Sequence, residues 1–102
     1  MAQHAALLGL GIENLALARY LLAHGYEITI CDRRTEAELG ERLEELHRAG
    51  VALQLGPDYL RGLDRFPVLY RSPGFPLFDQ ALVAARAAGC QISSAIRLFF
   101  AL

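Results

Sequence analysis

Three times in this chain a helix-like segment ends in glycine and a strand-like segment follows at once. The three stretches are HGYEITI from His24, AGVALQL from Ala49 and AGCQIS from Ala88. Glycine often ends helices because it adopts the left-handed conformation without strain. Helices and strands that alternate through such short connections are typical of a parallel sheet covered by helices. The chain is therefore predicted to fold as an α/β domain.

The predicted elements form a Rossmann-like α/β fold, a three-layer sandwich with a mostly parallel five-stranded sheet and helices on both faces. Strands are expected at residues 4–9, 27–32, 51–55, 67–70 and 90–93. Helices are expected at 12–24, 36–49, 79–88 and 95–102, with a short helical turn near 59–63. Thr35 is expected to cap the second helix together with Glu38. Right-handed crossovers bring the loops after the strands to one edge, where ligands bind in this fold class.

The length of the chain, 102 residues, suits one domain, and we expect residues 1–102 to form it. Its last segment, 96–102, is largely apolar and has no polar tail. Natural termini are usually more polar, so one interpretation is that the chain is the N-terminal piece of a longer protein. The alternative, that the last helix simply packs on the sheet, fits the pattern equally well.

The balanced charge of the chain argues against partners that bind through a strong positive or negative surface charge. Ten basic residues face eleven acidic ones, for a net charge of -1, so neither nucleic acid nor a membrane is attracted non-specifically. No apolar run approaches the roughly 20 residues of a membrane-spanning helix, and no signal peptide is indicated. We expect a cytoplasmic domain in which Cys31 and Cys90 are buried and reduced.

The absence of lysine removes several kinds of chemistry, since all ten basic residues are arginines. A P-loop needs a lysine at the nucleotide phosphates, and Schiff-base chemistry needs one as well. The histidines, His4, His24 and His47, are scattered without the spacing of metal ligands. No paired carboxylates and no Ser/His/Asp arrangement follow from the spacing. We expect neither a catalytic residue nor a metal site in this chain.

The strongest local signal is Gly9-Leu10-Gly11, between the first strand and the first helix. Glycines there permit a tight turn and a close approach to a phosphate, and the helix N-terminus favours an anion. Asp32 ends the second strand about 20 positions later, where dinucleotide-binding folds keep an acid for a ribose hydroxyl. A ligand-contacting turn is therefore favoured over a plain tight turn.

Two residues beside this turn argue against a dinucleotide cofactor. Asn14 stands in place of the third glycine of the fingerprint, which normally lets helix and strand pack closely. The first helix is therefore expected to lie further from the sheet. Glu13 would bring a negative charge close to a pyrophosphate. Both features favour a ligand that is held through fewer contacts.

Two further segments are candidate ligand contacts at the same edge. Arg33 and Arg34 follow Asp32, and arginines in such a place often meet a phosphate or stack on a base. A solvated loop pair remains the alternative. Ser72 opens the Ser72-Pro73-Gly74 loop after the fourth strand and offers a hydroxyl to a phosphate. The pattern alone favours a rigid turn there that only directs the chain.

The chain resembles, nearly from end to end, the N-terminal domain of the Mur ligases, in particular of the type that adds D-glutamate. The resemblance runs through LLGLGIENLALARYLLAHGYEITICDRR, QLGPD and YRSPGFPLFDQALVAARAAGCQI. Its most specific feature is the SPGFP loop followed by an alanine-rich helix that ends in AAG. The closing SSAIRLFF is similar to the strand and helix that lead to the central domain of that family.

The resemblance implies that the domain holds the uridine diphosphate of UDP-N-acetylmuramoyl-L-alanine, a peptidoglycan precursor. It places Gly11, Ile12, Glu13 and Asn14 under the diphosphate, Asp32 and Arg33 at uracil or ribose, Arg34 over the base and Ser72 at a phosphate. The full enzyme would use ATP and Mg to form an amide through an acyl phosphate. That chemistry would belong to downstream domains of the same chain, so the 102 residues alone are expected to be inactive and to need no cofactor.

Three residues depart from the pattern of that family. Asn14 replaces a common glycine, and Ala95 and Arg97 stand where acidic residues are usual. Two alternative functions therefore stay open. One is an NAD-binding Rossmann domain, which uses the same turn and the same acid. The other is a non-catalytic nucleotide-sensing or interaction module, with Phe99 and Phe100 as a partner surface.

Overall fold

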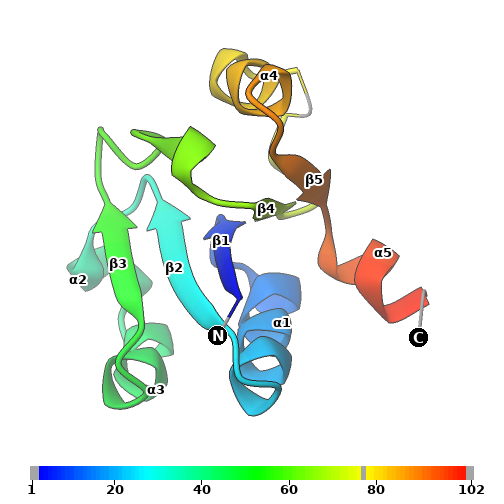
Figure 1. Cartoon of the computed structure of the whole chain (residues 1–102). Helices are drawn as coiled ribbons and strands as arrows, with labels where there is room; N and C mark the ends of the chain where they lie inside the picture. Colours follow the sequence, from blue (N-terminus) through cyan, green and yellow to red (C-terminus); the bar gives the residue numbers. More distant parts are fainter. Residues whose placement is uncertain (1–2, 77, 101–102) are drawn as a thin grey trace.

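The computed structural model describes residues 3–76 and 78–100, without the side chains of Phe99 and Phe100. The predicted α/β sandwich is confirmed, and its five-stranded sheet has the order β3-β2-β1-β4-β5 (Figure 1). Every strand pair in this sheet is parallel, so the sheet is parallel throughout and not only mostly so. The strands are β1 (His4–Leu8), β2 (Glu27–Asp32), β3 (Ala52–Leu55), β4 (Val68–Arg71) and β5 (Gln91–Ser93).

Helices cover both faces of the sheet. They are α1 (Ile12–Ala23), α2 (Glu36–Leu39), α3 (Arg42–Arg48), the 3-10 helix η1 (Leu63–Arg65), α4 (Gln80–Ala87) and α5 (Ala95–Phe100). Figure 1 shows α1, α3 and α5 on one side of the sheet and α4 on the other. The two faces therefore hold separate halves of the core.

The central strand β1 supplies side chains to both halves, because successive strand residues point to opposite faces. Ala5 and Leu7 pack in the half that contains α1 and α3, whereas Ala6 and Leu8 pack in the half that contains α4 and η1. All four side chains are fully buried. The unbroken apolar run of this strand is what a parallel strand covered on both faces requires.

The strand register aligns the ends of β1, β2 and β4. Leu8 pairs with Cys31 of β2 on one side and with Arg71 of β4 on the other. The next residues along the three strands are Gly9, Asp32 and Ser72. These three residues therefore lie side by side at the edge where the strands end, which is called the carboxyl edge below.

The predicted helix over residues 36–49 is wrong in one respect, because Gly40 breaks it into α2 and α3. Gly40 adopts a φ of 58°, in the left-handed region, and no helix continues through it. The predicted cap is confirmed: the Thr35 hydroxyl accepts from the Glu38 N–H, and the Glu38 carboxylate accepts from the Thr35 N–H. The break turns the start of α3 back toward the glycine turn.

One other helical segment differs from the prediction. The helical segment expected near 59–63 lies later, as η1, and residues 57–62 form turns before it.

In α5, Ala95 and Leu98 pack against the core beside α1, whereas Ile96 is 52% exposed. The interface predicted for Phe99 and Phe100 lies outside the described side chains. None of the helices in the described ranges has the length and apolar character that a membrane crossing requires.

Candidate functional site at the carboxyl edge

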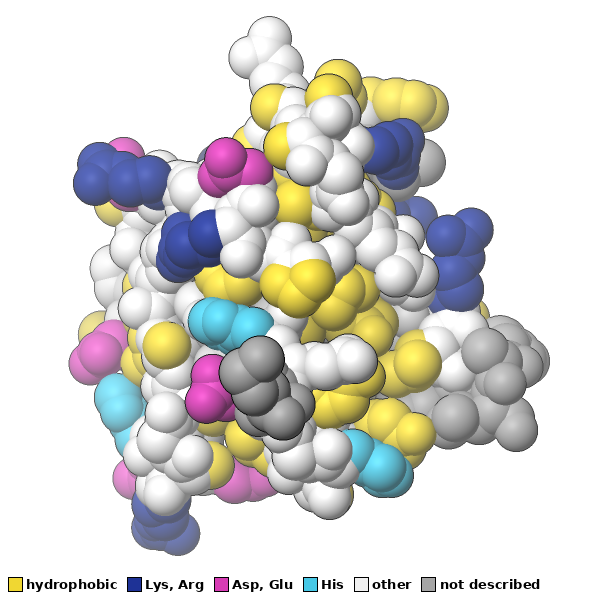
Figure 2. Space-filling model, viewed as in Figure 1, with side chains coloured by type: hydrophobic (Ala, Val, Ile, Leu, Met, Phe, Trp, Pro, Cys, Tyr) yellow, Lys and Arg dark blue, Asp and Glu magenta, His cyan; other side chains and the backbone are white. Residues whose placement is uncertain are grey.

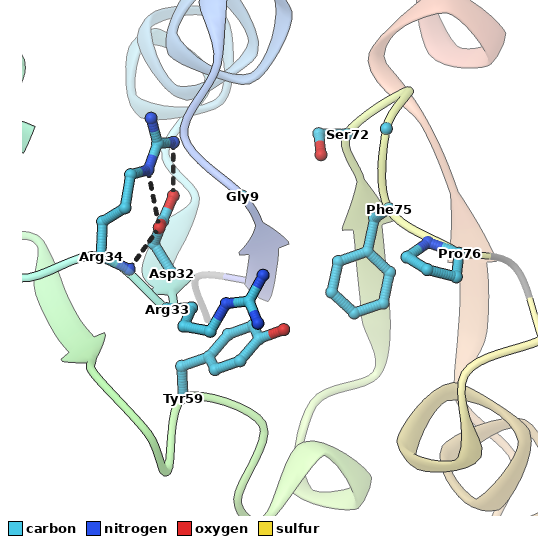
Figure 3. Close-up of a pocket in the computed structure, with 9 residues that line it drawn as sticks. Gly9, Asp32, Arg33, Arg34, Tyr59, Ser72, Phe75 and Pro76 are labelled. Atoms are coloured by element: carbon cyan, nitrogen blue, oxygen red, sulfur yellow. Dashed lines mark hydrogen bonds and ion pairs between the residues drawn. The ribbon is translucent and has the colours of Figure 1, made fainter.

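A cavity of about 280 Å³ opens at the carboxyl edge, between the ends of β1, β2 and β4. It is lined by Gly9, Asp32, Arg33, Arg34, Tyr59, Ser72, Gly74, Phe75 and Pro76. Figure 3 shows the side chains at and just after the end of β2, together with Tyr59, facing those of the loop after β4 across the cavity. Of the predicted contacts, Asp32, Arg33, Arg34 and Ser72 are brought together here.

Gly9 and Ser72 join the two backbone bends at this edge. The Ser72 N–H donates to the carbonyl of Leu8 at 2.9 Å, and the Gly9 N–H donates to the carbonyl of Cys31 at 2.8 Å. Gly9 has a φ of 87°, and a Cβ on it would lie 2.6 Å from the Ser72 hydroxyl oxygen. The serine hydroxyl therefore occupies space that only a glycine leaves open.

Asp32 holds the glycine turn and Arg34 at the same time. Its Oδ2 accepts from the Leu10 N–H at 2.7 Å and from Arg34 Nη2 at 2.8 Å. Its Oδ1 accepts from the Arg34 N–H at 2.8 Å and from Arg34 Nε at 3.0 Å. Asp32 is 4% exposed, and each of its carboxylate oxygens accepts from two donors. Direct contact of Asp32 with a ligand would require Arg34 to move.

The charge state of Asp32 follows from these contacts. Burial by itself would raise the pKa of this carboxyl, because the charged form loses its water. The hydrogen bonds from the Arg34 guanidinium and from the N–H groups of Arg34 and Leu10 outweigh burial. The pKa of Asp32 therefore lies below its usual value, and the group is a carboxylate at neutral pH.

Asn14 supports the turn from below. It is fully buried, and its side-chain nitrogen donates to the carbonyl of Gly9 at 2.8 Å, with longer bonds to Leu8 and Tyr70. This side chain therefore ties β1, the turn and β4 together. Its Oδ1 is buried without a hydrogen-bond partner. Because Asn14 is inaccessible, its effect on a ligand would pass through the turn.

The other predicted residues of the glycine turn form the start of α1 and do not line the cavity. Gly11 is the N-cap of α1, with an extended backbone and no capping side chain. The N–H groups of the first helical turn are therefore open to an anion. Ile12 is 86% exposed and Glu13 is exposed beside it. The charge of Glu13 lies close to the place where an anion would bind.

The structure adds residues that the sequence pattern did not indicate. Tyr59, Phe75 and Pro76 give the cavity an apolar wall. Phe75 and Pro76 belong to the predicted SPGFP loop, but Tyr59 reaches the site only because β3 ends at the same edge. Arg42 Nη1 donates to the carbonyl of Leu10 at 2.9 Å, beside Arg34 Nη2 at 3.2 Å. No sequence signal indicated Arg42, since its position depends on the break at Gly40.

The cavity combines guanidinium donors, a serine hydroxyl and an apolar wall, which suit an anionic group joined to a ring.

Cys31 and Cys90 are buried and free, as predicted. Burial raises the pKa of the Cys31 thiol to about 12. Within the described residues, no group of three or more His, Cys, Asp or Glu side chains is placed to hold a metal ion.

Fold and site together define a Rossmann-like α/β domain with a cavity at the carboxyl edge of a parallel sheet. The sequence assigns the chain to a narrower class than the fold does. Residues 3–94 match the family described as Mur ligase MurD-like, N-terminal domain, and the chain belongs to this family.

Individual relatives agree with this assignment. The chain is 43% identical over 98 residues to a protein of Symbiobacterium thermophilum named UDP-N-acetylmuramoylalanine--D-glutamate ligase, covering 96% of the chain and 22% of the relative. It is 36% identical over 97 residues to a protein of the same name from Ruminiclostridium cellulolyticum, covering 95% of the chain and 21% of the relative. The chain therefore spans about a fifth of the length of these relatives.

Proposed function

We propose that this domain binds the uridine diphosphate part of UDP-N-acetylmuramoyl-L-alanine within a ligase that adds D-glutamate in peptidoglycan precursor synthesis. The observation that carries the proposal is that the bends at Gly9 and Ser72 share one cavity with Asp32, Arg33 and Arg34. Family membership and the names of the relatives support the same substrate.

In this proposal the diphosphate lies across the glycine turn, against the open N–H groups at the start of α1. Those groups and the partial positive charge of the helix favour an anion. Arg33 is exposed on the rim and is free to follow the ligand. Arg34 is held by Asp32 and Leu10, so its guanidinium is already in position. Ser72 donates to a phosphate from the opposite bend.

The cavity is smaller than a whole nucleotide sugar requires. Its volume of about 280 Å³ lies just below the roughly 300 Å³ at which pockets for drug-sized molecules begin. It suits one part of the ligand, while the rest extends over Gly11 and the exposed Ile12. Tyr59 and Phe75 offer ring contacts to the uracil.

The ligase reaction itself would require parts of the protein beyond these 102 residues. This chain has no lysine to hold the phosphates of ATP. Within the described ranges, no group of three or more His, Cys, Asp or Glu side chains is placed to hold a metal ion. We infer that ATP use and amide formation belong to downstream domains, and that this domain contributes substrate binding alone.

Titration of the ¹⁵N-labelled chain with UDP, followed by NMR, tests the proposed binding. Amides at Gly11–Asn14, Asp32–Arg34 and Ser72 should shift in a saturable manner, while those of α3 and α4 stay unchanged. Gly11→Ala is the informative variant, because a Cβ there meets no atom closer than 3.8 Å in the ligand-free fold. It should weaken UDP binding while the spectrum of the folded chain is retained.

A parallel titration with NAD separates the proposal from the dinucleotide alternative. UDP should bind more tightly than NAD, because a cavity of about 280 Å³ suits a single nucleotide better than a dinucleotide. Tighter binding of NAD, or no shift at millimolar UDP, would overturn the proposed function.

A further inference from the structure

A second depression lies at the carboxyl ends of β4 and β5, beyond the loop that carries Ser72. Its volume is about 170 Å³. It is lined by Arg71, Arg86, Ile92, Ser93, Ser94 and Arg97. This size is well below the roughly 300 Å³ of pockets for drug-sized ligands, so a compact group would fit it.

Three arginines from three elements line this depression, since Arg71 ends β4, Arg86 lies in α4 and Arg97 lies in α5. No acidic residue is among the residues that line it. In Figure 2, the Lys and Arg colour gathers at the upper right of the view, over α4, β5 and α5, without the Asp and Glu colour beside it. A net charge of -1 for the whole chain makes this local excess of positive charge notable.

None of these three arginines forms an ion pair with a described residue. Arg19, Arg34 and Arg61, in contrast, each pair with a carboxylate within 3.1 Å. Arg71 makes one long hydrogen bond of 3.4 Å to the carbonyl of Phe75. Like charges that converge without a counter-charge repel one another, and a bound anion relieves this repulsion.

The serines at the end of β5 add hydroxyl groups to the same place. Ser94 Oγ accepts from the Arg97 N–H at 3.2 Å, which leaves its own proton available to an acceptor. The Ser93 hydroxyl has no hydrogen-bond partner among the described residues. Forked guanidinium donors and hydroxyl donors together match the oxygens of a phosphate group.

We propose that Arg71, Arg86 and Arg97, with Ser93 and Ser94, form a second oxyanion site that takes a compact phosphate dianion. The site is separate from the proposed nucleotide cavity, although Arg71 and Ser72 are neighbours in the chain. Arg71 lines one depression and Ser72 lines the other. Phosphate binding at this second site therefore does not depend on UDP binding in the first cavity.

Titration of the ¹⁵N-labelled chain with inorganic phosphate, at constant ionic strength maintained with sodium chloride, tests this site. Amides of Ser93, Ser94 and Arg97 should shift in a saturable manner. The same amides should not respond to chloride alone, because a general ionic-strength effect only screens charges. Shifts at Gly11 and Ser72 report the other cavity in the same spectra, so the two sites are distinguished.

Two variants and one control define the contribution of the arginines. Arg97→Glu and Arg86→Gln should each weaken phosphate binding at Ser93 and Ser94 by about tenfold or more, since each removes charge-assisted hydrogen bonds. Both side chains belong to exposed residues, so the fold should be retained. Arg48→Gln, at the end of α3, removes an exposed arginine elsewhere and should leave binding unchanged.

A titration with acetate separates a phosphate site from a general carboxylate site. Phosphate should bind more tightly, because it carries more charge and more acceptor oxygens. Equal shifts with acetate and phosphate would overturn the proposed selectivity. Shifts that do not saturate, or that survive in Arg97→Glu, would overturn the site itself.

Discussion

The hydroxyl of Ser72 occupies the space that a side chain on Gly9 would fill. The two residues follow paired strands, β4 and β1, and a Cβ on Gly9 would lie 2.6 Å from Ser72 Oγ and 3.3 Å from Ser72 Cβ. Real Cβ atoms do not approach another atom as closely as 2.6 Å. The two bends of the candidate site are therefore fitted to each other before any ligand is present.

Gly9→Ala should destabilise the domain by at least about 2 kcal/mol, because it adds left-handed backbone strain to the contact with Ser72. Urea unfolding followed by circular dichroism measures the loss. Gly74→Ala is the matched control, since Gly74 has open space around it and an ordinary φ. The double variant Gly9→Ala/Ser72→Gly should recover the part of the loss that arises from the contact. Equal stability of Gly9→Ala and the natural chain would contradict this packing.

Asp32→Asn should destabilise the domain by about 2–3 kcal/mol at neutral pH. The variant leaves the partly exposed Arg34 without its carboxylate and weakens the bond to the N–H of the buried Leu10. Chemical denaturation at pH 7 measures the difference. A loss that is no larger than that of an exposed Asp58→Asn control would argue against this role.

The stability that Asp32 contributes should depend on pH in a defined direction. The folded pKa of this carboxyl is lower than the value of about 3.9 in an unfolded chain. Its contribution is therefore present above that unfolded value and is lost as the pH falls through the folded pKa. Unfolding curves from pH 7 down to pH 2 should show the natural chain and Asp32→Asn converging at the acidic end. A constant difference across this range would contradict the lowered pKa.

Substitution of the two arginines after Asp32 should affect UDP binding and stability to different degrees. Arg33 is exposed and has no hydrogen-bond partner among the described residues, so Arg33→Ala should leave unfolding unchanged but weaken UDP binding about tenfold. Arg34 is bonded to Asp32 and Leu10, so Arg34→Ala should also lower stability by about 1–2 kcal/mol. Paired thermal unfolding and NMR titration test both. Arg48→Ala serves as the exposed control, and a stability loss in Arg33→Ala would show that its role is structural.

Both cysteines should resist thiol reagents in the folded domain. The thiolate is the reactive form, and burial raises the pKa of Cys31 to about 12 and raises that of Cys90 as well. Labelling with a disulfide reagent at pH 8 should be slow in buffer and should accelerate in denaturant as the chain unfolds. Rapid labelling of the folded chain would show that one of the thiols is accessible.

Much of the fold followed from local patterns in the sequence. Glycine after each of the helices at 12–24 and 79–88 marked the helix end correctly, and Gly25 and Gly89 adopt positive φ as such positions require. The pairing of Thr35 with Glu38 also needs only a few neighbouring residues, and it was predicted correctly. These features depend on short-range sterics and hydrogen bonds, so the sequence is sufficient to predict them.

The helix over 36–49 shows where local pattern failed. Its leucines at 39, 43 and 46 have helical spacing, and all three are buried in the same half of the core. These leucines can be buried in the same core whether they lie on two short helices or on one long helix. Gly40 takes the left-handed conformation and redirects the chain, which brings Arg42 to the carbonyl of Leu10. A spacing pattern alone does not distinguish the two arrangements.

The sequence by itself determined the order of strands and helices, the residues of the glycine turn and the acid that ends β2, because propensity, capping and burial act over a few residues. Only the tertiary structure decided that Gly9, Asp32 and Ser72 share one level of the sheet, since strand register joins segments far apart in the chain. The same long-range packing buried Asn14 beneath the turn and brought Tyr59 to the cavity. It also gathered Arg71, Arg86 and Arg97, which no pattern of neighbours connects.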